Sequence, residues 1–388
     1  MTEKFTTGEL CGPTPNVGES RKKRFATAGR AMRSSASLMS STTSRTGLFS
    51  GGNWIVDAVK LIDFWPQQDT LANIFSTTKG TGGSPFNVLV DLALMGAPFA
   101  LEAVGLVGDD GDGAWILEQC AARNIDTQAL QKTSSAPTSY TDVMTVRDTG
   151  RRTFFHARGA NALLESAHFD FTQTNARIFH LGYLLLLDKL DASHPEYGTV
   201  AAEVLARAQA AGLKTSIDCV SEDSDRFAKI VLPALKHVDV CIMNEFEAGR
   251  VTGRKVRVGD PHSSAPGSAF LDRAELRAAM QQLLDAGVRE RVVVHFPGGG
   301  CALGRDGAWH EHGSVQLPGD YIKGAAGAGD AFTAGILYGW HEAKPVEEWL
   351  RIGVCAAAAN LSDETCTGGL KPLADCLALG ERYGYRAG

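Results

Sequence analysis

The stretch Gly324-Ala325-Ala326-Gly327-Ala328-Gly329-Asp330-Ala331-Phe332-Thr333-Ala334-Gly335 runs from a loop of small residues into an apolar helix. Glycines directly before a helix leave the first backbone N–H groups unobstructed, and the helix dipole favours an anion at that point. A carboxylate at the same helix start is well placed to take a proton from a hydroxyl group that lies beside the anion. Phosphoryl transfer to an alcohol needs this pairing. The alternative is that Asp330 only caps the helix.

On both sides of this stretch, short apolar runs alternate with helical patterns from about residue 51 to the C-terminus. Near-continuous apolar runs are what parallel strands buried on both faces require. The alternation therefore predicts an α/β fold with a doubly wound, mostly parallel sheet and helices on both faces. The expected strands are 53–57, 101–107, 178–187, 214–218, 238–243 and 291–296, and the expected helices are 86–95, 113–123, 197–211, 227–236, 271–286, 330–341 and 346–361.

Two segments break the alternation, about 58–78 and 138–157. Both have the pattern of antiparallel strands outside the main sheet, and the second is a hairpin that turns at 148–150. Together they predict a small β-sheet that acts as a lid over one edge of a cleft. The segment 253–268, rich in Gly, Ser, Pro and charged residues, is expected to be a surface insertion.

Charge divides the chain into two parts. Residues 1–50 carry eight Lys and Arg against three Asp and Glu, which leaves a charge of −11 on residues 51–388 of a chain whose net charge is −6. The first 50 residues form a basic, Ser/Thr-rich extension that is expected to be disordered, because it has too little apolar surface to bury. Residues 51–388 are expected to form one domain. Their acidity argues against nucleic-acid binding.

Composition also limits the location of the protein. The chain lacks the ~18 consecutive apolar residues that a membrane helix needs, so a membrane span is not expected. The eight cysteines are scattered, without a pair spaced as in zinc sites or disulfide scaffolds. We therefore expect reduced thiols and a cytoplasmic protein.

Other glycine motifs narrow the class of enzyme. The chain has no G-x-x-x-x-G-K-[ST] sequence, which excludes a P-loop kinase, and no G-x-G-x-x-G follows the first expected strand, which argues against a Rossmann dehydrogenase. Two glycine-rich segments do occur, at 80–87 and 105–113. Each is a weak signal alone.

Taken in order, five motifs resemble those of the PfkB (ribokinase-like) family of carbohydrate kinases. The resemblance spans about residue 51 to the C-terminus. The motifs are Gly82-Gly83 with Asn87, Gly105-x-Val107-Gly108-x-Asp110-x-x-Gly113, Gly159-Ala160-Asn161, Asn244-x-x-Glu247 and Gly327-Ala328-Gly329-Asp330. The resemblance implies a ribokinase-like fold with a β-sheet lid.

Functional residues are also implied by the resemblance. Asp330 would be the general base, and the backbone of Gly327, Ala328 and Gly329 would form the anion hole. Nucleotide and metal contacts would come from Asn244, Glu247, Gly298 and Gly300, with Glu247 meeting Mg²⁺ through water. The sugar would contact Asp57, Gly82, Gly83, Asn87 and Asn161.

Physical arguments support some of these roles. Asp57 closes an apolar run, and ligands of open α/β sheets bind beyond the carboxyl ends of strands. Asn244 and Glu247 also follow an expected strand, and their spacing puts both on one face of a starting helix. The alternatives are a surface carboxylate at Asp57, a helix cap at Asn244 and a simple turn at Asn161.

The sequence departs from the family pattern in two places. Relatives have Asp-Thr before G-A-G-D, where this chain has Gly324-Ala325. That acidic position helps to bind a monovalent cation in many relatives, so activation by K⁺ is in doubt. His295 and Pro297 stand where relatives tend to have Thr and Gly, and a proline has no N–H to offer a phosphate.

These observations predict a kinase that uses ATP and Mg²⁺ to phosphorylate a hydroxyl group of a sugar or sugar acid. One alternative is a nucleoside kinase of the same fold. A second is a sugar- or nucleotide-binding protein that has lost catalysis, which the two departures suggest and the intact Gly327–Asp330 motif opposes. The expected partners are small molecules, without nucleic acid or membrane, and a homodimer through the lid is left open.

Overall fold

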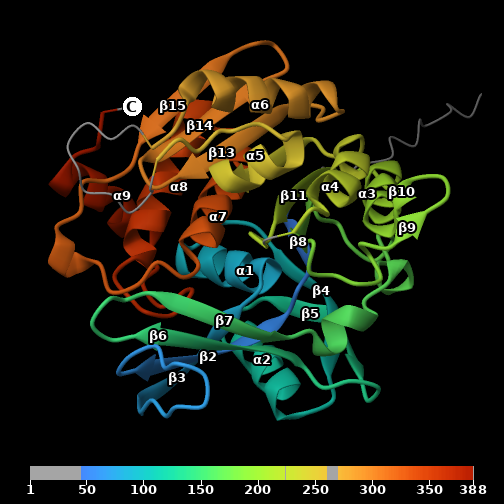
Figure 1. Cartoon of the computed structure of the whole chain (residues 1–388). Helices are drawn as coiled ribbons and strands as arrows, with labels where there is room; N and C mark the ends of the chain where they lie inside the picture. The colour runs from blue at the N-terminus through green and yellow to red at the C-terminus, as the bar shows by residue number, and fades with distance from the viewer. Residues whose placement is uncertain (1–44, 223, 260–269, 388) are drawn as a thin grey trace, which may run out of the picture. The chain divides into compact units, whose positions relative to one another are not determined.

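The computed structural model describes residues 45–222, 224–259 and 270–387, and these contain a large central sheet (Figure 1). The strand order is β15-β14-β13-β12-β11-β8-β1-β4-β5. Neighbouring strands pair in parallel from β13 to β5, whereas β14 and β15 continue the sheet as antiparallel strands. The strands are β1 Leu48–Gly52, β4 Leu101–Gly108, β5 Asp126–Thr133, β8 Ile178–Leu184, β11 Lys214–Cys219, β12 Val240–Asn244, β13 Arg291–Phe296, β14 Gly299–Gly304 and β15 Trp309–Gly313.

Helices cover both faces of this sheet, and each face has its own hydrophobic core. One core packs α3, α4, α5 and α6 on the sheet, and the other packs α1, α2, α7, α8 and α9 (Figure 1). The structure therefore confirms the doubly wound α/β fold that the alternation of strands and helices in the sequence predicts. The helices are α1 Ser84–Leu94, α2 Gly111–Ala121, α3 Val200–Ala210, α4 Phe227–Leu235, α5 Glu245–Thr252, α6 Arg273–Asp285, α7 Ala328–His341, α8 Val346–Asn360 and α9 Leu373–Tyr383.

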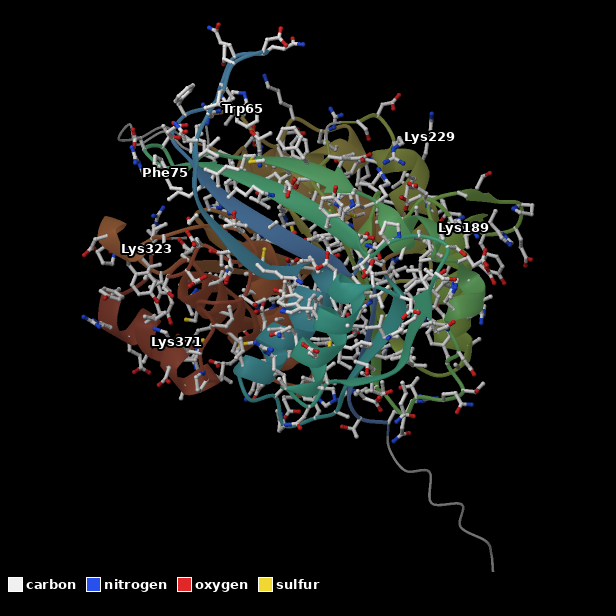
Figure 2. The ribbon with its side chains drawn as sticks, turned by 90° about the horizontal axis from the view of Figure 1, so that it is seen from below. Trp65, Phe75, Lys189, Lys229, Lys323 and Lys371 are labelled. Atoms are coloured by element: carbon white, nitrogen blue, oxygen red, sulfur yellow. The ribbon has the colours of Figure 1, made fainter. Side chains whose placement is uncertain are left out.

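A second sheet forms the predicted lid, in the order β3-β2-β6-β7. Its strands are β2 Ile55–Ile62, β3 Ile74–Gly82, β6 Ser139–Val146 and β7 Arg152–Ala157, and a small β9-β10 ribbon (Ser193–His194, Gly198–Thr199) lies elsewhere. Across the lid, Asp57 is opposite Thr141, and Thr141 is opposite His156. Figure 2 shows Trp65 and Phe75 at one end of the lid, where both side chains are about half exposed.

The start of the fold differs from the prediction. The first strand of the main sheet is β1, between β8 and β4, so Leu48–Ser50 belong to the folded domain and their assignment to the extension was wrong. The sequence pattern does not mark β1 as a strand, because it contains small residues in place of an apolar run. A Cβ on Gly51 would lie 2.6 Å from Val104 Cγ1, so close packing requires glycine there. The expected main-sheet strand 53–57 was also wrong, because Asp57 lies on β2 of the lid. Residues 1–44 of the extension and 260–269 of the insertion lie outside the described residues.

Some elements were not predicted at all. The sequence pattern missed β5, β14, β15 and α9. Strand β5 lies at the edge of the sheet, and of its residues only Leu130 is buried, so it lacks the apolar run that marked the inner strands. Each of the seven cysteines in the described residues is a buried free thiol, and among these residues no helix has the length and apolarity to cross a bilayer.

Helix α1 carries a buried acid, Asp91, whose two carboxylate oxygens lack a hydrogen-bond partner among the described residues. Burial, followed by the nearby Asp330 carboxylate, raises the pKa of Asp91 well above its usual value. The folded protein therefore holds a proton that the unfolded chain releases above about pH 4. The free energy of unfolding consequently falls as pH rises, by about 1.4 kcal/mol per pH unit for this one proton, until the pKa of the folded state is passed.

We expect the substitution Asp91→Ala to remove this part of the pH dependence. The melting temperature of the variant should rise relative to that of the wild type as the pH increases from about 4 to about 8, measured by thermal unfolding. Asp320→Ala, at an exposed carboxylate, serves as the control. A difference between variant and wild type that is the same at every pH would contradict the assignment of a buried, protonated Asp91.

Candidate active site

A cavity of 450 Å³ lies where the inner face of the lid meets the carboxyl ends of the main-sheet strands. Its polar lining comes from distant parts of the chain. The lid contributes Asp57, Thr141, Arg152 and His156; α1 contributes Asn87; β8, β11 and β12 contribute Tyr183, Asp218 and Asn244; and α5 and α7 contribute Glu247 and Asp330. The fold therefore brings most of the predicted site residues together.

Asp330 lies in the first turn of α7 and is almost completely buried. Asn87 Nδ2 donates a hydrogen bond to Asp330 Oδ2 at 2.7 Å, and the Tyr183 hydroxyl lies 2.8 and 2.9 Å from the two carboxylate oxygens. Burial, and then the negative charge of Asp218, raises the pKa of Asp330 to about 7, against the opposing effect of the two hydrogen bonds. A carboxylate with such a pKa can accept a proton near neutral pH.

The loop before α7 has the conformation that its glycines allow. Gly327 caps the helix in the left-handed region with φ of 72°, and a Cβ there would lie 2.1 Å from the carbonyl oxygen of Cys366. The side chain of the buried Asn360 donates a hydrogen bond to the Ala326 carbonyl at 2.6 Å, which fixes the loop from behind. The first amides of α7 are therefore held towards the cavity beside Asp330, where they can bind an anion.

Asp57 faces the cavity from the lid. Burial raises the pKa of Asp57 to about 7, although hydrogen bonds from Cys366 and Thr141 and the charge of Arg152 lower it. The Cys366 thiol lies 3.3 Å from Asp57 Oδ2. Gly82 is in close contact with this carboxylate, because a Cβ there would lie 2.3 Å from Asp57 Oδ1. The glycine thus leaves room for Asp57 rather than lining the cavity itself.

Asp218, the second-last residue of β11, also lines the cavity. Its Oδ2 accepts a hydrogen bond from the Ser84 hydroxyl at 2.5 Å, and Ser84 in turn lies 3.1 Å from His180 Nε2. The other oxygen, Oδ1, is buried and has no partner among the described residues. Asp218 therefore presents a free acceptor to the cavity, and its charge is the strongest neighbouring influence on the pKa of Asp330.

Asn244 and Glu247 form a capping box at the start of α5. Asn244 Oδ1 accepts from the Glu247 amide at 2.9 Å, and Glu247 Oε2 accepts from the Asn244 amide at 2.9 Å. Ser221 also donates to Glu247, at 2.7 Å. The pKa of Glu247 is raised to about 8. Burial is the main cause, and the hydrogen bonds from Asn244 and Ser221 act against it. The cap and the cavity lining are the same residues, so the two interpretations of this motif do not exclude each other.

Five predicted residues do not line this cavity: Gly82, Asn161, Gly298, Gly300 and Ala328. The Asn161 side chain donates to the Trp54 carbonyl at 3.1 Å and accepts from the Trp54 amide at 3.2 Å, which ties the connection between β1 and β2 to the segment after β7. Gly298 lies at the turn between β13 and β14, and Gly300 lies in β14, where a Cβ would lie 2.7 Å from Phe332 Cζ. Gly83 and Asn87 do line the cavity.

Sequence reasoning missed several cavity residues. Asp218 ends an expected strand, so the rule that ligands bind beyond strand ends could have found it. Tyr183 lies inside an expected apolar strand, and nothing in the sequence marks it as polar lining. Arg152 and His156 alternate along β7, and only the orientation of the lid shows that their face points inwards.

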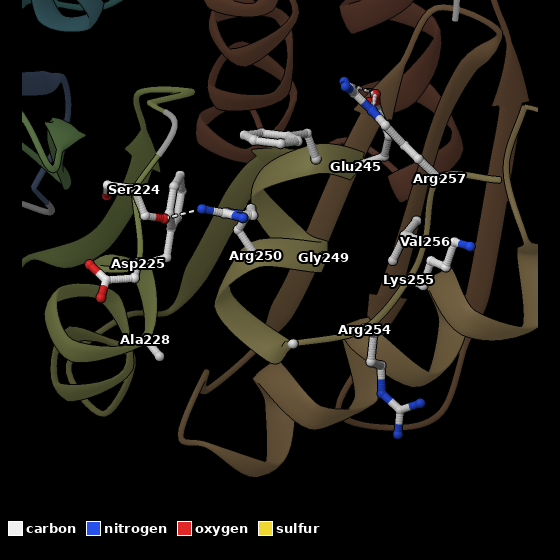
Figure 3. A pocket seen from close by; sticks show the side chains of 13 residues that line it. Ser224, Asp225, Ala228, Glu245, Gly249, Arg250, Arg254, Lys255, Val256 and Arg257 are labelled. Carbon is white, nitrogen blue, oxygen red and sulfur yellow. Dashed lines mark hydrogen bonds and ion pairs between the residues drawn. The ribbon is translucent and has the colours of Figure 1, made fainter. Parts of the chain in front are cut away.

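A second pocket, of 560 Å³, is lined by residues of α4, α5 and the segment that follows α5 (Figure 3). Figure 3 shows three arginines around it, of which Arg257 is paired with the buried Glu245 and Arg254 with Glu275. None of the predicted site residues lines this pocket. The candidate active site is therefore the cavity beneath the lid.

Comparison with known protein families identifies the family of this chain. The family model described as pfkB family carbohydrate kinase matches residues 52–372. The chain belongs to the PfkB family of carbohydrate kinases. This membership confirms the resemblance seen in the five sequence motifs, and it makes the protein a carbohydrate kinase.

Individual PfkB relatives are distant. A probable chloroplastic fructokinase-6 from Arabidopsis thaliana is 27% identical over 288 residues, which are 71% of this chain and 67% of that protein. An ATP-dependent ribose-1-phosphate kinase from Halopiger xanaduensis is 26% identical over 336 residues, 85% of this chain and 96% of that protein. The structure of Arabidopsis thaliana ribokinase complexed with ribose and ATP superposes with a TM-score of 0.68 at 20% identity and covers 86% of this chain and 98% of that chain. This likeness confirms the ribokinase-like fold.

Proposed function

We propose that this PfkB protein transfers the γ-phosphate of ATP to a hydroxyl group of a sugar or sugar acid. The observation that carries the proposal is the position of Asp330, a buried carboxylate with a pKa of about 7 at the start of α7, beside the glycine loop. A base and an anion cradle at one point provide the two elements that phosphoryl transfer to an alcohol requires.

The residues of the cavity have different roles in the proposed reaction. Asp330 accepts the proton of the substrate hydroxyl, whose oxygen attacks the γ-phosphorus as the bond to the β-phosphate oxygen breaks. The backbone amides of Gly327, Ala328 and Gly329 bind the negative charge that develops on the transferred group. Asp57, Gly83 and Asn87 hold the other hydroxyl groups of the sugar. Asn87 has a second function, since its amide also orients Asp330.

The cavity also suits Mg²⁺, which binds oxygen ligands. Asp218 has a buried carboxylate oxygen without a partner among the described residues. Glu247 lies close enough to Asp218 for the negative charge of Asp218 to raise its pKa. Asp218 and Glu247 would hold the ion, with Glu247 acting through water. A bound Mg²⁺ would neutralise charge on the phosphates during transfer.

The test of the proposed function is a panel of sugars, sugar acids and nucleosides assayed for ATP consumption with Mg²⁺. The curated relatives are named for fructose and ribose 1-phosphate, and the solved neighbour holds ribose, so these compounds belong in the panel. Phosphorylation of a sugar or sugar acid supports the proposal. Turnover of nucleosides alone would make the protein a nucleoside kinase, and binding without turnover would contradict the assignment of Asp330.

Two further features support the rest of the proposal. The free, buried thiols of the described residues are consistent with the reducing cytoplasm in which we place the enzyme. Exposed apolar side chains on the lid support a homodimer through this sheet. These side chains are Phe64, Trp65, Leu71, Ile74 and Phe75.

Substitution of Glu247 should change the metal requirement. With Glu247→Gln we expect a higher Mg²⁺ concentration for half activity and a lower kcat, with little change in the KM for sugar, because the carboxylate meets the ion or its water. In the wild type, Mg²⁺ affinity should rise with pH up to about 8, as Glu247 loses its proton; the variant should lack this part of the pH dependence. Glu118→Gln, at an exposed site on α2, is the control. A change confined to the sugar KM would place Glu247 elsewhere.

The absence of an acid before the glycine loop should weaken any response to K⁺. A Cβ on Gly324 would lie 2.8 Å from the Asp363 carbonyl oxygen, so the backbone leaves no room for an acidic side chain there. Replacing K⁺ by tetramethylammonium at constant ionic strength should therefore change kcat by less than about twofold, because cation binding depends on the number and charge of oxygen ligands. A many-fold loss of activity would show that carbonyl groups or another acid supply the site.

A further inference from the structure

Arg152 is the only Lys or Arg among the described residues that line the active-site cavity. It begins β7 of the lid, and the two-residue period of the strand puts Arg152, Phe154 and His156 on one face. All three line the cavity. The lid therefore turns one permanent positive charge towards a site whose other charged residues are acids.

The guanidinium group of Arg152 has no hydrogen-bond or ion-pair partner among the residues that the structure describes. Its Nη1 atom is buried and donates a hydrogen bond to none of the described residues. No carboxylate of those residues lies within the 4.0 Å of an ion pair, although Asp57 and Cys366 are near enough to act on its charge. A buried charged donor without an acceptor costs free energy. A ligand that supplies an acceptor at this point would recover that cost.

Two of the other unpartnered atoms of the cavity are acceptors, the buried amide oxygen Asn87 Oδ1 and the buried carboxylate oxygen Asp218 Oδ1. His156 Nε2 also lacks a partner among the described residues, and Nδ1 of the same ring lies 3.0 Å from the Thr141 hydroxyl. Acceptors suit the hydroxyl groups of a sugar. Arg152 instead suits an anionic group, since a guanidinium binds carboxylate and phosphate oxygens through paired hydrogen bonds.

We propose that Arg152 binds a carboxylate or phosphate group of the acceptor, so that the substrate is a negatively charged sugar. This inference rests on the proposed kinase function and names the substrate class of the same site. The competing role for Arg152 is a counter-charge for Asp57. A counter-charge would affect charged and neutral sugars alike, whereas recognition of an anionic group affects only the charged ones.

The experiment compares matched substrates in the wild type and in lid variants. The pairs are D-gluconate with D-glucose, D-ribonate with D-ribose, and ribose 1-phosphate with D-ribose, each assayed for kcat/KM by ATP consumption. The variants are Arg152→Gln, which removes the charge, and Arg152→Lys, which keeps it. Arg151→Gln is the matched control, because Arg151 is exposed at the neighbouring position outside the strand.

We expect the wild type to prefer the charged member of at least one pair, and Arg152→Gln to lose about 10²-fold in kcat/KM for that member only. Arg152→Lys should recover part of the loss, and Arg151→Gln should behave as wild type. The preferred pair tells carboxylate from phosphate. Equal loss for charged and neutral sugars, or a wild type that prefers neutral sugars, would overturn the inference while leaving the kinase function intact.

Thermal unfolding with the same compounds separates the two proposals. If no sugar is phosphorylated but gluconate, ribonate or ribose 1-phosphate raises the melting temperature of the wild type and not of Arg152→Gln, the kinase function fails and the anion site stands. If the charged compounds give neither turnover nor a shift in melting temperature, the inference on Arg152 is wrong.

Discussion

The substitution Asp330→Asn should lower kcat by roughly 10² to 10⁴, the usual contribution of a positioned general base. The fold should be kept, because the new carbonyl oxygen can still accept from Tyr183, which lies 2.8 Å from Asp330 Oδ1. The amide nitrogen of the substituted side chain would then replace Oδ2 and face Asn87 Nδ2, which is also a donor. The hydrogen bond from Asn87 is lost in this arrangement, so we expect a small loss of stability. ATP binding should be little changed, since the amides of the loop before α7 remain in place.

The pH dependence gives an independent check on Asp330. The base acts only when deprotonated, so kcat/KM of the wild type should fall as pH drops below about 7. The residual activity of Asp330→Asn should lack this dependence on Asp330. Asp320→Asn, at an exposed position, serves as the control and should match the wild type. Near-normal turnover by a folded Asp330→Asn enzyme would mean that another group takes the proton.

The sequence predicts the main sheet well where strands are buried on both faces. Runs such as Val292–Val294 on β13 are typical of interior strands. Strand β1 was not predicted, because three of its five residues are the small residues Ser50, Gly51 and Gly52. Its place in the centre of the sheet depends on close backbone packing, and a pattern of apolar side chains cannot report such packing.

The candidate site was predictable where a motif carries its own local geometry. Asp330 and the glycine loop belong to a helix start, and Asn244 with Glu247 belong to another, so short-range spacing places them. Asp218 and Arg152 reach the cavity only through the arrangement of the sheet and lid. Their roles depend on which strand face points inwards, and that property is set by tertiary packing.

Substitution of Gly327 should also cause a large loss of kcat. Its φ of 72° lies in the left-handed region, and a Cβ would lie 2.1 Å from the carbonyl oxygen of Cys366. The substitution Gly327→Ala must therefore move the loop, and with it the first amides of α7. Loss of one such donor costs roughly 10² to 10³ in kcat in an oxyanion hole, so we expect a loss at least of that order.

A control at Gly253 separates strain from displacement. Gly253 caps the C-terminus of α5 with φ of 71° and ψ of 13°, the same left-handed region as Gly327, but a Cβ there would meet nothing within 4 Å. Gly253→Ala should cost about 1–2 kcal/mol in the free energy of unfolding, from the left-handed conformation alone, and leave kcat unchanged. Steady-state kinetics and thermal unfolding of both variants test this. If Gly327→Ala loses stability as Gly253→Ala does but keeps its kcat, the amides before Asp330 do not stabilise the transferred phosphoryl group, and the charge must be balanced by the metal ion and side chains of the cavity.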